Sequence, residues 1–470
     1  MIAERDLRAC VNRCISALSL GRREEGADTM SPPQVPEDGL PSYTREEVAQ
    51  HKKSTDCWVI LHGQVYDVTK WLGKHPGGAR LIMHYAGQDA TLAWTSFHHN
   101  KAMVRKYLAQ YHIGKICPEQ KELQPIEKDF LTLRDKMEAK GFFKTNPLFF
   151  VAHFLHIVLF CFAAWGTLWY YGNNWITWLA AAALTTVSQA QAGWLQHDFG
   201  HHTVFDVINL NRALHHVVIG LMKGVSSFWW NYRHYQHHAK PNVYLKDPDI
   251  TIPYVVLLGK IIPEKWGKKR WGTMPYNFQQ HYFFLIGPPL LLPIYFHVEV
   301  LFYVLKKRKW IDFACMLIFY MIFHYTFAPF LGGFWPSFRF YFFIRFMESH
   351  WFVWATQISH IPMNIDLDHR QDWPSLQLAG TRNVEQSFMN DWFLGHLNFQ
   401  IEHHLFPTMP RHNFLKAKPY VIEYCKKYNL DYQEKPIWTA FGDIVRSLKE
   451  SGEIWAEAWD AHIPTKTKAN

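Results

Sequence analysis

Cysteines are few in this chain: there are seven among 470 residues, and no two of them form a C-x-x-C pair. This sparse pattern predicts free thiols in a reducing compartment. The first thirty residues also lack the apolar core of a signal peptide. The sequence therefore gives no sign of a disulfide-bonded, secreted protein.

Charged residues are also somewhat scarce, at 19% of the chain, although the net charge is +9. No long basic run accompanies base-stacking motifs, which argues against nucleic acid as a partner. We interpret the positive surplus as cytosolic charge that faces a membrane.

Apolar residues are gathered in long blocks, although the mean hydropathy of the chain is only −0.18. Each block is long enough to cross the roughly 30 Å hydrocarbon core of a lipid bilayer. The blocks cover residues 149–171, 175–194, 282–305, 310–331 and 338–361. The sequence therefore predicts an integral membrane protein with polar segments between the blocks.

Three histidine clusters have the spacing of metal ligands on one face of a helix, where positions i, i+3 and i+4 lie together. The first holds His197 and His201, the second His234, His237 and His238, and the third Gln400, His403 and His404. Seven imidazoles suit two metal ions, and nitrogen donors without cysteine suit iron, zinc or copper. The spacing predicts the metal site and leaves the identity of the metal open.

These clusters resemble the three histidine boxes of the membrane-bound fatty acyl desaturases. A third box that opens with glutamine, here Gln400, is typical of the front-end subfamily. The resemblance implies two non-haem iron ions and makes the residues of the three boxes catalytic. It also implies a further ligand near the end of the last membrane helix, where His360 stands. Whether Gln400 itself binds iron stays open, since an amide is a poorer donor than imidazole.

The segment WVILHGQVYDVTKWLGKHPGG, followed by HYAGQDAT, closely resembles cytochrome b5. Residues 58–61 and 65–68 are expected to form two strands around a turn at 62–64. The resemblance makes His75 one axial ligand of haem b and His98 the second, with His99 as the alternative. Two histidine ligands leave no open position on haem iron, which suits electron transfer. Zinc in the histidine boxes has no redox chemistry and would leave this domain without a purpose.

The expected fold is therefore multi-domain, with a small α+β haem domain before a mostly α-helical membrane domain that has four transmembrane helices and a cytosolic histidine-box cap. The linker carries apolar residues at near-helical spacing (Ile126, Phe130, Leu133 and Met137), which predicts an amphipathic helix. Lys466 and Lys468 resemble an endoplasmic-reticulum retrieval signal. The expected divisions are a disordered extension at 1–40, the haem domain at 41–117, a linker at 118–147, the desaturase domain at 148–445 and a tail at 446–470.

The topology follows from a count of crossings. Boxes two and three must meet at one metal pair, yet three apolar blocks lie between them, so one block does not cross. The basic residues 306–309 are expected in the cytosol, which makes 282–305 a bent, re-entrant or interfacial segment. Crossings are then expected at 149–171, 175–194, 310–331 and 338–357. The weak point is the last crossing, because Arg339, Arg345 and Glu348 are costly in lipid unless they face protein or the interface.

The resemblance implies a front-end desaturase of the endoplasmic reticulum that acts on polyunsaturated fatty acyl-CoA with dioxygen. Electrons would pass from NADH-cytochrome b5 reductase through the fused haem to the iron pair. Stretches such as QAQAGWLQHD, ESHWFVW and NVEQSFMNDWF resemble the vertebrate delta-6/delta-5 group, and delta-6 is favoured over delta-5.

Two other interpretations remain open at this point. A sphingoid-base desaturase or a lipid hydroxylase shares the histidine boxes, and its lipid products would distinguish it. A membrane-anchored haem carrier without catalysis needs only the first 115 residues and two membrane spans. That carrier would bind no non-haem iron, whereas the enzyme would bind about two ions per chain.

Overall fold

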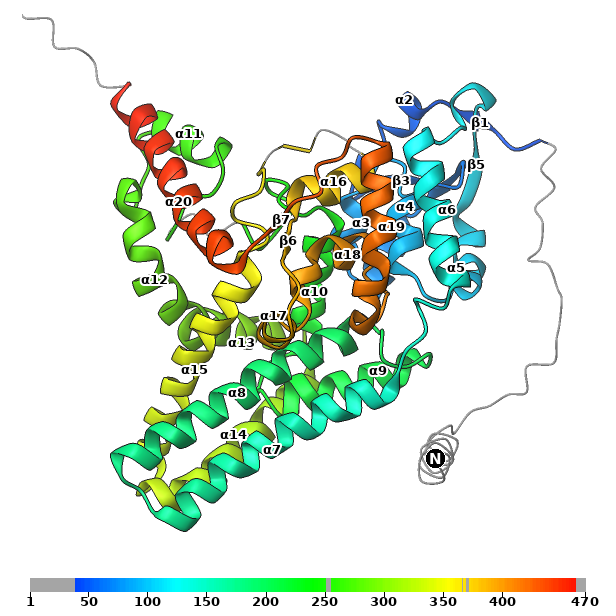
Figure 1. The fold of residues 1–470 in the computed structure, drawn as a ribbon. Coiled ribbons are helices and arrows are strands. Elements are labelled where there is room, and N and C mark those ends of the chain that lie inside the picture. Colours follow the sequence, from blue (N-terminus) through cyan, green and yellow to red (C-terminus); the bar gives the residue numbers. More distant parts are fainter. Residues whose placement is uncertain (1–38, 251–254, 366, 369–371, 462–470) are drawn as a thin grey trace, which may run out of the picture.

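The computed structural model describes residues 39–250, 255–365, 367–368 and 372–461. A small α+β domain is followed by a larger, mostly helical domain, as the sequence predicts (Figure 1). The predicted disordered extension at 1–40 lies outside the described residues up to residue 38, and so do Lys466 and Lys468 of the predicted retrieval signal. The five cysteines within the described part of the chain, Cys57, Cys117, Cys161, Cys315 and Cys425, are free.

The N-terminal domain is built on one five-stranded sheet with the strand order β1-β5-β4-β3-β2. Its strands are β1 (Ser42–Tyr43), β2 (Lys52–Lys53), β3 (Asp56–Leu61), β4 (Gln64–Asp67) and β5 (His112–Ile116). Strands β3 and β4 pair antiparallel around the predicted turn at residues 62–64, where Gly63 has a positive φ of 73°. Alternate residues of β3, such as Val59 and Leu61, enter the core because successive side chains point to opposite faces.

Short helices lie on both faces of this sheet, because Val48 packs with Ile60 and Val65 on one face, whereas Leu72 and Trp94 pack with Val59 and Leu61 on the other. They are α2 (Arg45–Val48), η1 (Thr69–Lys74), α3 (Ala79–Met83), α4 (Thr91–Phe97), α5 (Lys101–Leu108), η2 (Ala109–Tyr111) and η3 (Pro118–Gln120). Helix α2 begins with a capping box formed by Thr44 and Glu47. The turn after His75 depends on its glycines. A Cβ on Gly77 would lie 3.0 Å from the His75 ring, and Gly78 has a φ of 89°.

The linker forms helix α6 (Pro125–Ala139), which confirms the predicted amphipathic helix. Its apolar face packs on the C-terminal part of the chain, where Phe130 stacks on Phe406 with ring centroids 5.3 Å apart. Tyr424 also donates a 2.7 Å hydrogen bond to the carbonyl of Ile126. The linker therefore lies against the helical domain.

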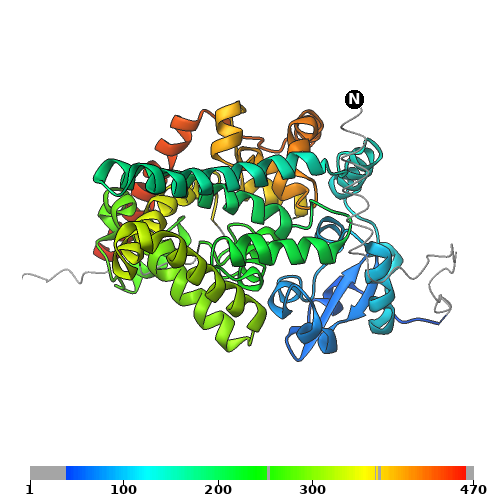
Figure 2. The same ribbon diagram turned by 90° about the horizontal axis from the view of Figure 1, so that it is seen from below.

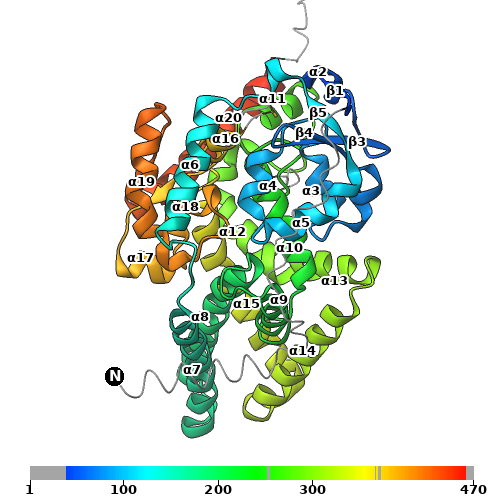
Figure 3. The ribbon, with the colours of Figure 1, turned by 90° about the vertical axis from the view of Figure 1, so that its right-hand side faces the viewer.

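Four long helices form two hairpins that extend to the same end of the molecule (Figures 1 and 3). They are α7 (Pro147–Tyr171), α8 (Trp175–Gly200), α14 (Trp310–Leu331) and α15 (Phe334–Gln357). The Asn174 side chain caps α8 by accepting from the backbone of Ile176 and Thr177, which produces the tight turn after α7. The four helices correspond to the four predicted crossings.

Length and hydropathy give a different set of membrane spans. Within the described part of the chain, three helical stretches are long and apolar enough to cross a membrane: Pro147–Tyr171, Tyr276–Lys306 and Trp310–Leu331. Helices α8 and α15 fall short because they carry polar residues, such as Gln189 in α8 and Arg345 in α15, that are buried against protein. The predicted number of four spans therefore stays a prediction.

The third apolar block is a helix with an interruption. It consists of α12 (Gln279–Leu290), the π-helical turn η6 (Leu291–Phe296) and α13 (His297–Lys306). Pro288 and Pro289 lie inside α12 just before the π-helical turn, which matches the prolines expected to bend it. Helix α12 lies beside α15 and the C-terminal helix α20 (Ile437–Asp460) in Figure 1.

The remaining elements form a cap at one end of the four long helices. They are α9 (Ile208–His215), η4 (His216–Leu221), α10 (Ser227–Ala239), α11 (Ile261–Lys268), η5 (Tyr276–Phe278), α16 (Trp373–Gly380), α17 (Phe388–Phe393), η7 (Leu397–Phe399), α18 (Gln400–Leu405), η8 (Arg411–Asn413) and α19 (Phe414–Lys427). Two short strands, β6 (Asn383–Val384) and β7 (Glu434–Lys435), pair parallel. The expected domain boundary at 445 falls inside α20.

The N-terminal domain lies beside the cap (Figures 2 and 3). Its helix α3 is next to α10, and Tyr85 donates a 2.7 Å hydrogen bond to the carbonyl of Ala239 at the end of α10. Lys246 donates a 2.9 Å bond back to the carbonyl of His84. These contacts bring the N-terminal domain close to the second histidine box.

Candidate metal centres

The three histidine boxes meet inside the cap, at the end of α8, along α10 and along α18. Together with His360 they supply eight histidines, whose ring nitrogens form two groups in which the ligand atoms lie within 4.8 Å of one another. The first group holds His197, His201, His234, His238 and His403, and the second holds His237, His360 and His404. The fold thus brings together every histidine predicted for this site.

In the first group, ring nitrogens of several histidines point toward one another at close distance. Nε2 of His234 lies 2.8 Å from Nε2 of His201 and 3.0 Å from Nε2 of His238. Burial, followed by the neighbouring imidazoles, holds the pKa of His234 and of His238 well below the usual range, so these rings are neutral. Converging lone pairs of neutral imidazoles repel unless a cation lies between them, so the donor set fits a bound metal ion.

The second group is oriented by hydrogen bonds on the outer ring nitrogens. Nδ1 of His360 donates to the carbonyl of Gly380 at 2.9 Å, and Nδ1 of His404 donates to Oε1 of Gln377 at 3.0 Å. Nε2 of His404 is buried and has no hydrogen-bond partner among the described residues. Both rings therefore carry no proton on Nε2, which is the tautomer that a metal requires.

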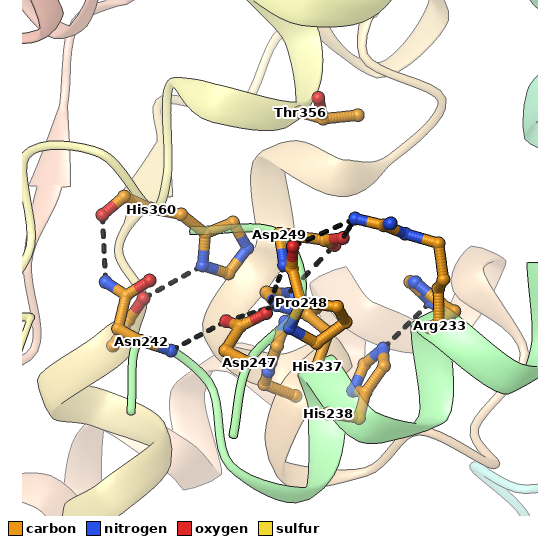
Figure 4. A network of polar contacts seen from close by, with 12 residues as sticks. Arg233, His237, His238, Asn242, Asp247, Pro248, Asp249, Thr356 and His360 are labelled. Atoms are coloured by element: carbon orange, nitrogen blue, oxygen red, sulfur yellow. Dashed lines mark hydrogen bonds and ion pairs between the residues drawn. The ribbon is translucent and has the colours of Figure 1, made fainter. Parts of the chain in front are cut away.

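Asp247 orients the third ring of this group, His237, and sequence reasoning missed it. The carboxylate accepts a 2.8 Å bond from Nδ1 of His237 and another 2.8 Å bond from the backbone of Asn242 (Figure 4). Burial lowers the pKa of His237, but the Asp247 carboxylate outweighs burial, so the pKa lies above its ordinary value. The only sequence signal is an acidic pair, Asp247 and Asp249, shortly after the second box.

Gln400 lies at the edge of the second group. Its Nε2 donates to Nε2 of His360 at 2.8 Å, and its Oε1 has no hydrogen-bond partner among the described residues. The amide therefore contacts the ring nitrogen that His360 would offer to a metal. Gln400 is placed to position that ligand, and a free acceptor oxygen remains on its side chain.

The histidines that the box spacing does not select lie outside both groups. Four of them lie close to the boxes in the sequence: His202, His215, His216 and His396. Two of them have other partners, since Nε2 of His215 lies 2.8 Å from Oε1 of Gln196 and Nδ1 of His216 lies 2.8 Å from Asp312.

In the N-terminal domain, His75 and His98 face each other with ring centroids 6.4 Å apart. A metal ion bound by both rings, each at about 2.0–2.1 Å from its nitrogen, fits this spacing. Nδ1 of His98 donates to the carbonyl of Trp94 at 2.9 Å, which leaves Nε2 free. His99 points elsewhere, and its Nε2 donates to the carbonyl of His201 at 3.1 Å. The geometry thus places His98 opposite His75.

The eight-histidine site opens onto an apolar cavity of about 210 Å³. His197, His237 and His360 line it, and so does Gln400. Much of the remaining lining is aromatic or aliphatic, including Trp194, Trp229, Leu258, Phe283, Phe296 and Phe352. On α15 the lining extends from Glu348 to Gln357, about 13 Å of helix. This shape suits a long apolar chain.

A buried ionic cluster lies where the cavity is farthest along α15 from His360. Glu348 pairs with Arg345 at 2.6 Å and with Lys223, and Lys223 also donates to the carbonyl of Gln189 at 2.6 Å. Arg345 and Glu348 are 3% and 4% exposed, so both face protein, which meets the condition set for a crossing at this helix. Arg339, near the start of α15, is exposed.

Residues 173–436, more than half of the chain, match the fatty acid desaturase family. The chain belongs to this family. Residues 44–117 of the desaturase match the cytochrome b5-like haem/steroid binding domain, which indicates haem binding. Both site histidines of the N-terminal domain, His75 and His98, fall within that match. The chain is thus a desaturase with a cytochrome b5 domain fused on its N-terminal side.

Two solved structures are similar to the haem domain of this desaturase. Cytochrome b5 of Ostreococcus tauri virus 2 is 39% identical, covers 16% of this chain and 94% of its own, and has a TM-score of 0.15. Cytochrome b558 of Ectothiorhodospira vacuolata, described as a prokaryotic homologue of cytochrome b5, is 37% identical with coverages of 16% and 98% and a TM-score of 0.15.

The family and the geometry together support an oxygen-dependent oxidoreductase of the membrane. The apolar helices agree with a membrane protein, and the histidine groups agree with non-haem metal. The family match covers all three boxes, which a simple haem carrier would leave without a role.

Proposed function

We propose that the chain is a front-end fatty acyl desaturase that places a cis double bond in polyunsaturated fatty acyl-CoA, with delta-6 favoured and delta-5 next. The observation that carries this proposal is the eight-histidine site, which is open to an apolar cavity and lies beside a fused two-histidine domain. Non-haem iron fits the two groups, because nitrogen donors without sulfur suit iron and the fused haem domain supplies electrons.

The reaction joins two electrons, two protons and dioxygen with two adjacent methylenes, and yields one double bond and two waters. Bound iron would supply the activation of dioxygen. The chain's own residues hold the metals and the substrate. The box histidines and His360 act as ligands, and Gln377 and Asp247 fix the orientation of two of those rings. The cavity excludes water from the acyl chain.

The haem domain would accept electrons from NADH-cytochrome b5 reductase. We assign haem b to His75 and His98, since burial lowers the pKa of His75 to about 4 and keeps its ring neutral and able to bind metal. His99 is not assigned as a haem ligand, because its ring is turned toward the histidine boxes.

The cavity supports an acyl substrate. Its walls are mainly apolar, and the residues that line it include His197, His237 and His360 as well as the stretch of α15 from Glu348 to Gln357. An acyl chain that enters past the histidines would extend toward the cluster of Lys223, Arg345 and Glu348. The position of the new double bond then depends on how far the chain extends before it meets this cluster.

We place the enzyme in the endoplasmic-reticulum membrane with the haem domain and the histidine boxes in the cytosol. Crossings by α7, α8, α14 and α15 keep both boxes on one side, and the buried charges of α15 face protein. In a rival arrangement Tyr276–Lys306 crosses and α15 lies in the interface; hydropathy selects Tyr276–Lys306 but neither α8 nor α15. A glycosylation acceptor inserted beside Lys307 decides between them, since modification would place residues 306–309 in the lumen and support the rival.

Expression in yeast with a panel of polyunsaturated acids tests the function. We expect one new double bond on the carboxyl side of an existing one, and no product from the His403→Ala variant. Hydroxylated lipids or desaturated sphingoid bases in place of this product would contradict the proposal.

A further inference from the structure

Two neighbouring residues at the end of helix α4 contact the two metal-binding regions. The ring of His98 faces His75, with centroids 6.4 Å apart. The ring of the next residue, His99, turns the opposite way and donates a 3.1 Å hydrogen bond to the carbonyl of His201. His201 belongs to the five-histidine group. One peptide bond therefore separates the histidine that faces the haem site from the histidine that contacts the other centre.

The residue before this pair makes a second contact with the histidine boxes. The ring of Phe97 meets the edge of His238 with centroids 6.4 Å apart and the ring of Tyr235 at 6.1 Å. It also packs on Trp373 at 5.7 Å. Phe97 thus inserts into the helical domain beside a residue of the five-histidine group, while its own helix belongs to the haem domain.

The other contacts between the two domains differ from these. Tyr85 bonds to the carbonyl of Ala239, and Lys246 bonds to the carbonyl of His84. The ammonium of Lys240 also lies 4.8 Å from the centre of the Tyr85 ring. These contacts hold the domains together, but none of them joins a residue adjacent to His98 with a box histidine.

We propose that His99, supported by Phe97, is the route by which electrons leave the haem for the histidine-bound metal pair. The path runs from the His98 ring through one peptide unit to the His99 ring, and across the hydrogen bond to the His201 carbonyl and ring. This inference rests on the proposed function, because it requires redox-active metal in both sites. With both groups bound, each transfer would oxidise the haem held by His75 and His98 by one electron and would reduce one metal ion held by the box histidines by one electron. A pyridine-nucleotide-dependent flavoprotein reductase returns the electron to the haem, and two transfers supply one desaturation.

His99 can be replaced with little structural cost, because its side chain is exposed and leaves no cavity. His99→Leu removes the hydrogen-bond donor, whereas His99→Gln keeps an N–H that reaches toward the same carbonyl. His112→Leu is the matched control, since Nε2 of His112 also makes one side-chain hydrogen bond, at 2.8 Å to Gln64 in the same domain.

The experiment uses the full chain with haem and iron bound. The haem is reduced by NADH and the reductase, and then mixed with dioxygen and acyl-CoA substrate while haem absorbance is followed in a stopped-flow instrument. For His99→Leu we expect unchanged haem bands and unchanged reduction by the reductase, but reoxidation slowed by about tenfold or more. His99→Gln should recover most of the rate, and His112→Leu should match the wild type.

Reoxidation of His99→Leu at the wild-type rate would overturn the route. A second variant, Tyr85→Phe, removes a docking hydrogen bond and leaves His99 in place. If Tyr85→Phe slowed reoxidation as much as His99→Leu, the role of His99 would be docking and the route would again be wrong. If the wild-type haem were not reoxidised faster when substrate is added, the proposed function itself would fail, which is a different result from a failure of the route.

Discussion

His75 and His98 lie on two short segments of one small domain, whereas the eight histidines of the larger site come from α8, α10, α18 and the turn after α15. In the smaller site, the glycine turn positions the ring of His75, and a hydrogen bond to the carbonyl of Trp94 orients the ring of His98. The larger site depends on the packing of distant helices and on outer partners such as Asp247 and Gln377. The two-histidine site is thus set by two short segments of one domain, whereas the eight-histidine site requires the whole fold.

The largest expected effects come from two substitutions, each of which should disable one site and leave the other intact. His403→Ala removes a ligand from the five-histidine group, so we expect complete loss of desaturation with unchanged haem bands. His75→Ala should lose the haem and keep non-haem iron, because its domain folds around a separate core. Absorbance spectra and iron analysis of both purified variants measure this. Bleaching of the haem in His403→Ala would show that the two sites are not independent.

A second prediction concerns the buried ionic cluster of the larger domain. Glu348→Ala leaves Arg345 and Lys223 buried without their carboxylate, which should destabilise the protein by about 3–5 kcal/mol. The control is Glu453→Ala, whose 3.7 Å pair with Lys449 is exposed and should change stability by less than about 1 kcal/mol. Thermal unfolding in detergent measures both, and equal effects would contradict a structural role for the cluster.

A third prediction concerns the residues that orient the ligand histidines of the larger site by hydrogen bonds to their outer ring nitrogens. Asp247→Asn places an amide N–H where the carboxylate now accepts hydrogen bonds from His237 and Asn242. We expect the affinity for non-haem iron to fall by about 10–100-fold. Iron retention during titration with a chelator measures the loss.

Asp312→Asn is the control for this change, because Asp312 pairs with His216, a histidine outside both groups. It should retain iron as the wild type does. Equal iron loss in the two variants would mean that Asp247 supports the fold and not the metal.

Much of the candidate site could be predicted from the sequence because its ligands follow helical spacing. The patterns around His197, His237 and His403 place ligands on single helix faces, and the fold brings those faces together. The HPGG turn at His75 and the strands of the haem domain could also be predicted, because each is formed by a short, regular stretch of sequence.

Other features could not be read from the sequence because they depend on long-range contacts. The division of the eight histidines into groups of five and three follows from how α10 and α18 pack, and no spacing expresses it. Asp247 lies in a loop without periodicity. The choice between His98 and His99 required the direction of two adjacent rings.

The membrane topology could be predicted from the sequence only in part. Apolar length identifies α7 and α14, but α8 and α15 carry buried polar side chains that lower their hydropathy. A mean hydropathy treats every side chain of a helix as if it faced lipid. Helices α8 and α15 are surrounded in part by protein, so their buried polar residues lower the mean without entering lipid. The interruption of α12–α13 by a π-helical turn was anticipated by its prolines, although its path relative to the membrane stays a prediction.

We expect one chain to hold a haem between two histidines and a metal pair among eight. The most direct test is metal analysis of the purified full-length protein alongside its haem spectrum. We expect one haem and about two non-haem irons per chain, with His403→Ala lowering only the non-haem iron. Zinc in place of iron, or no metal beyond the haem, would contradict this expectation.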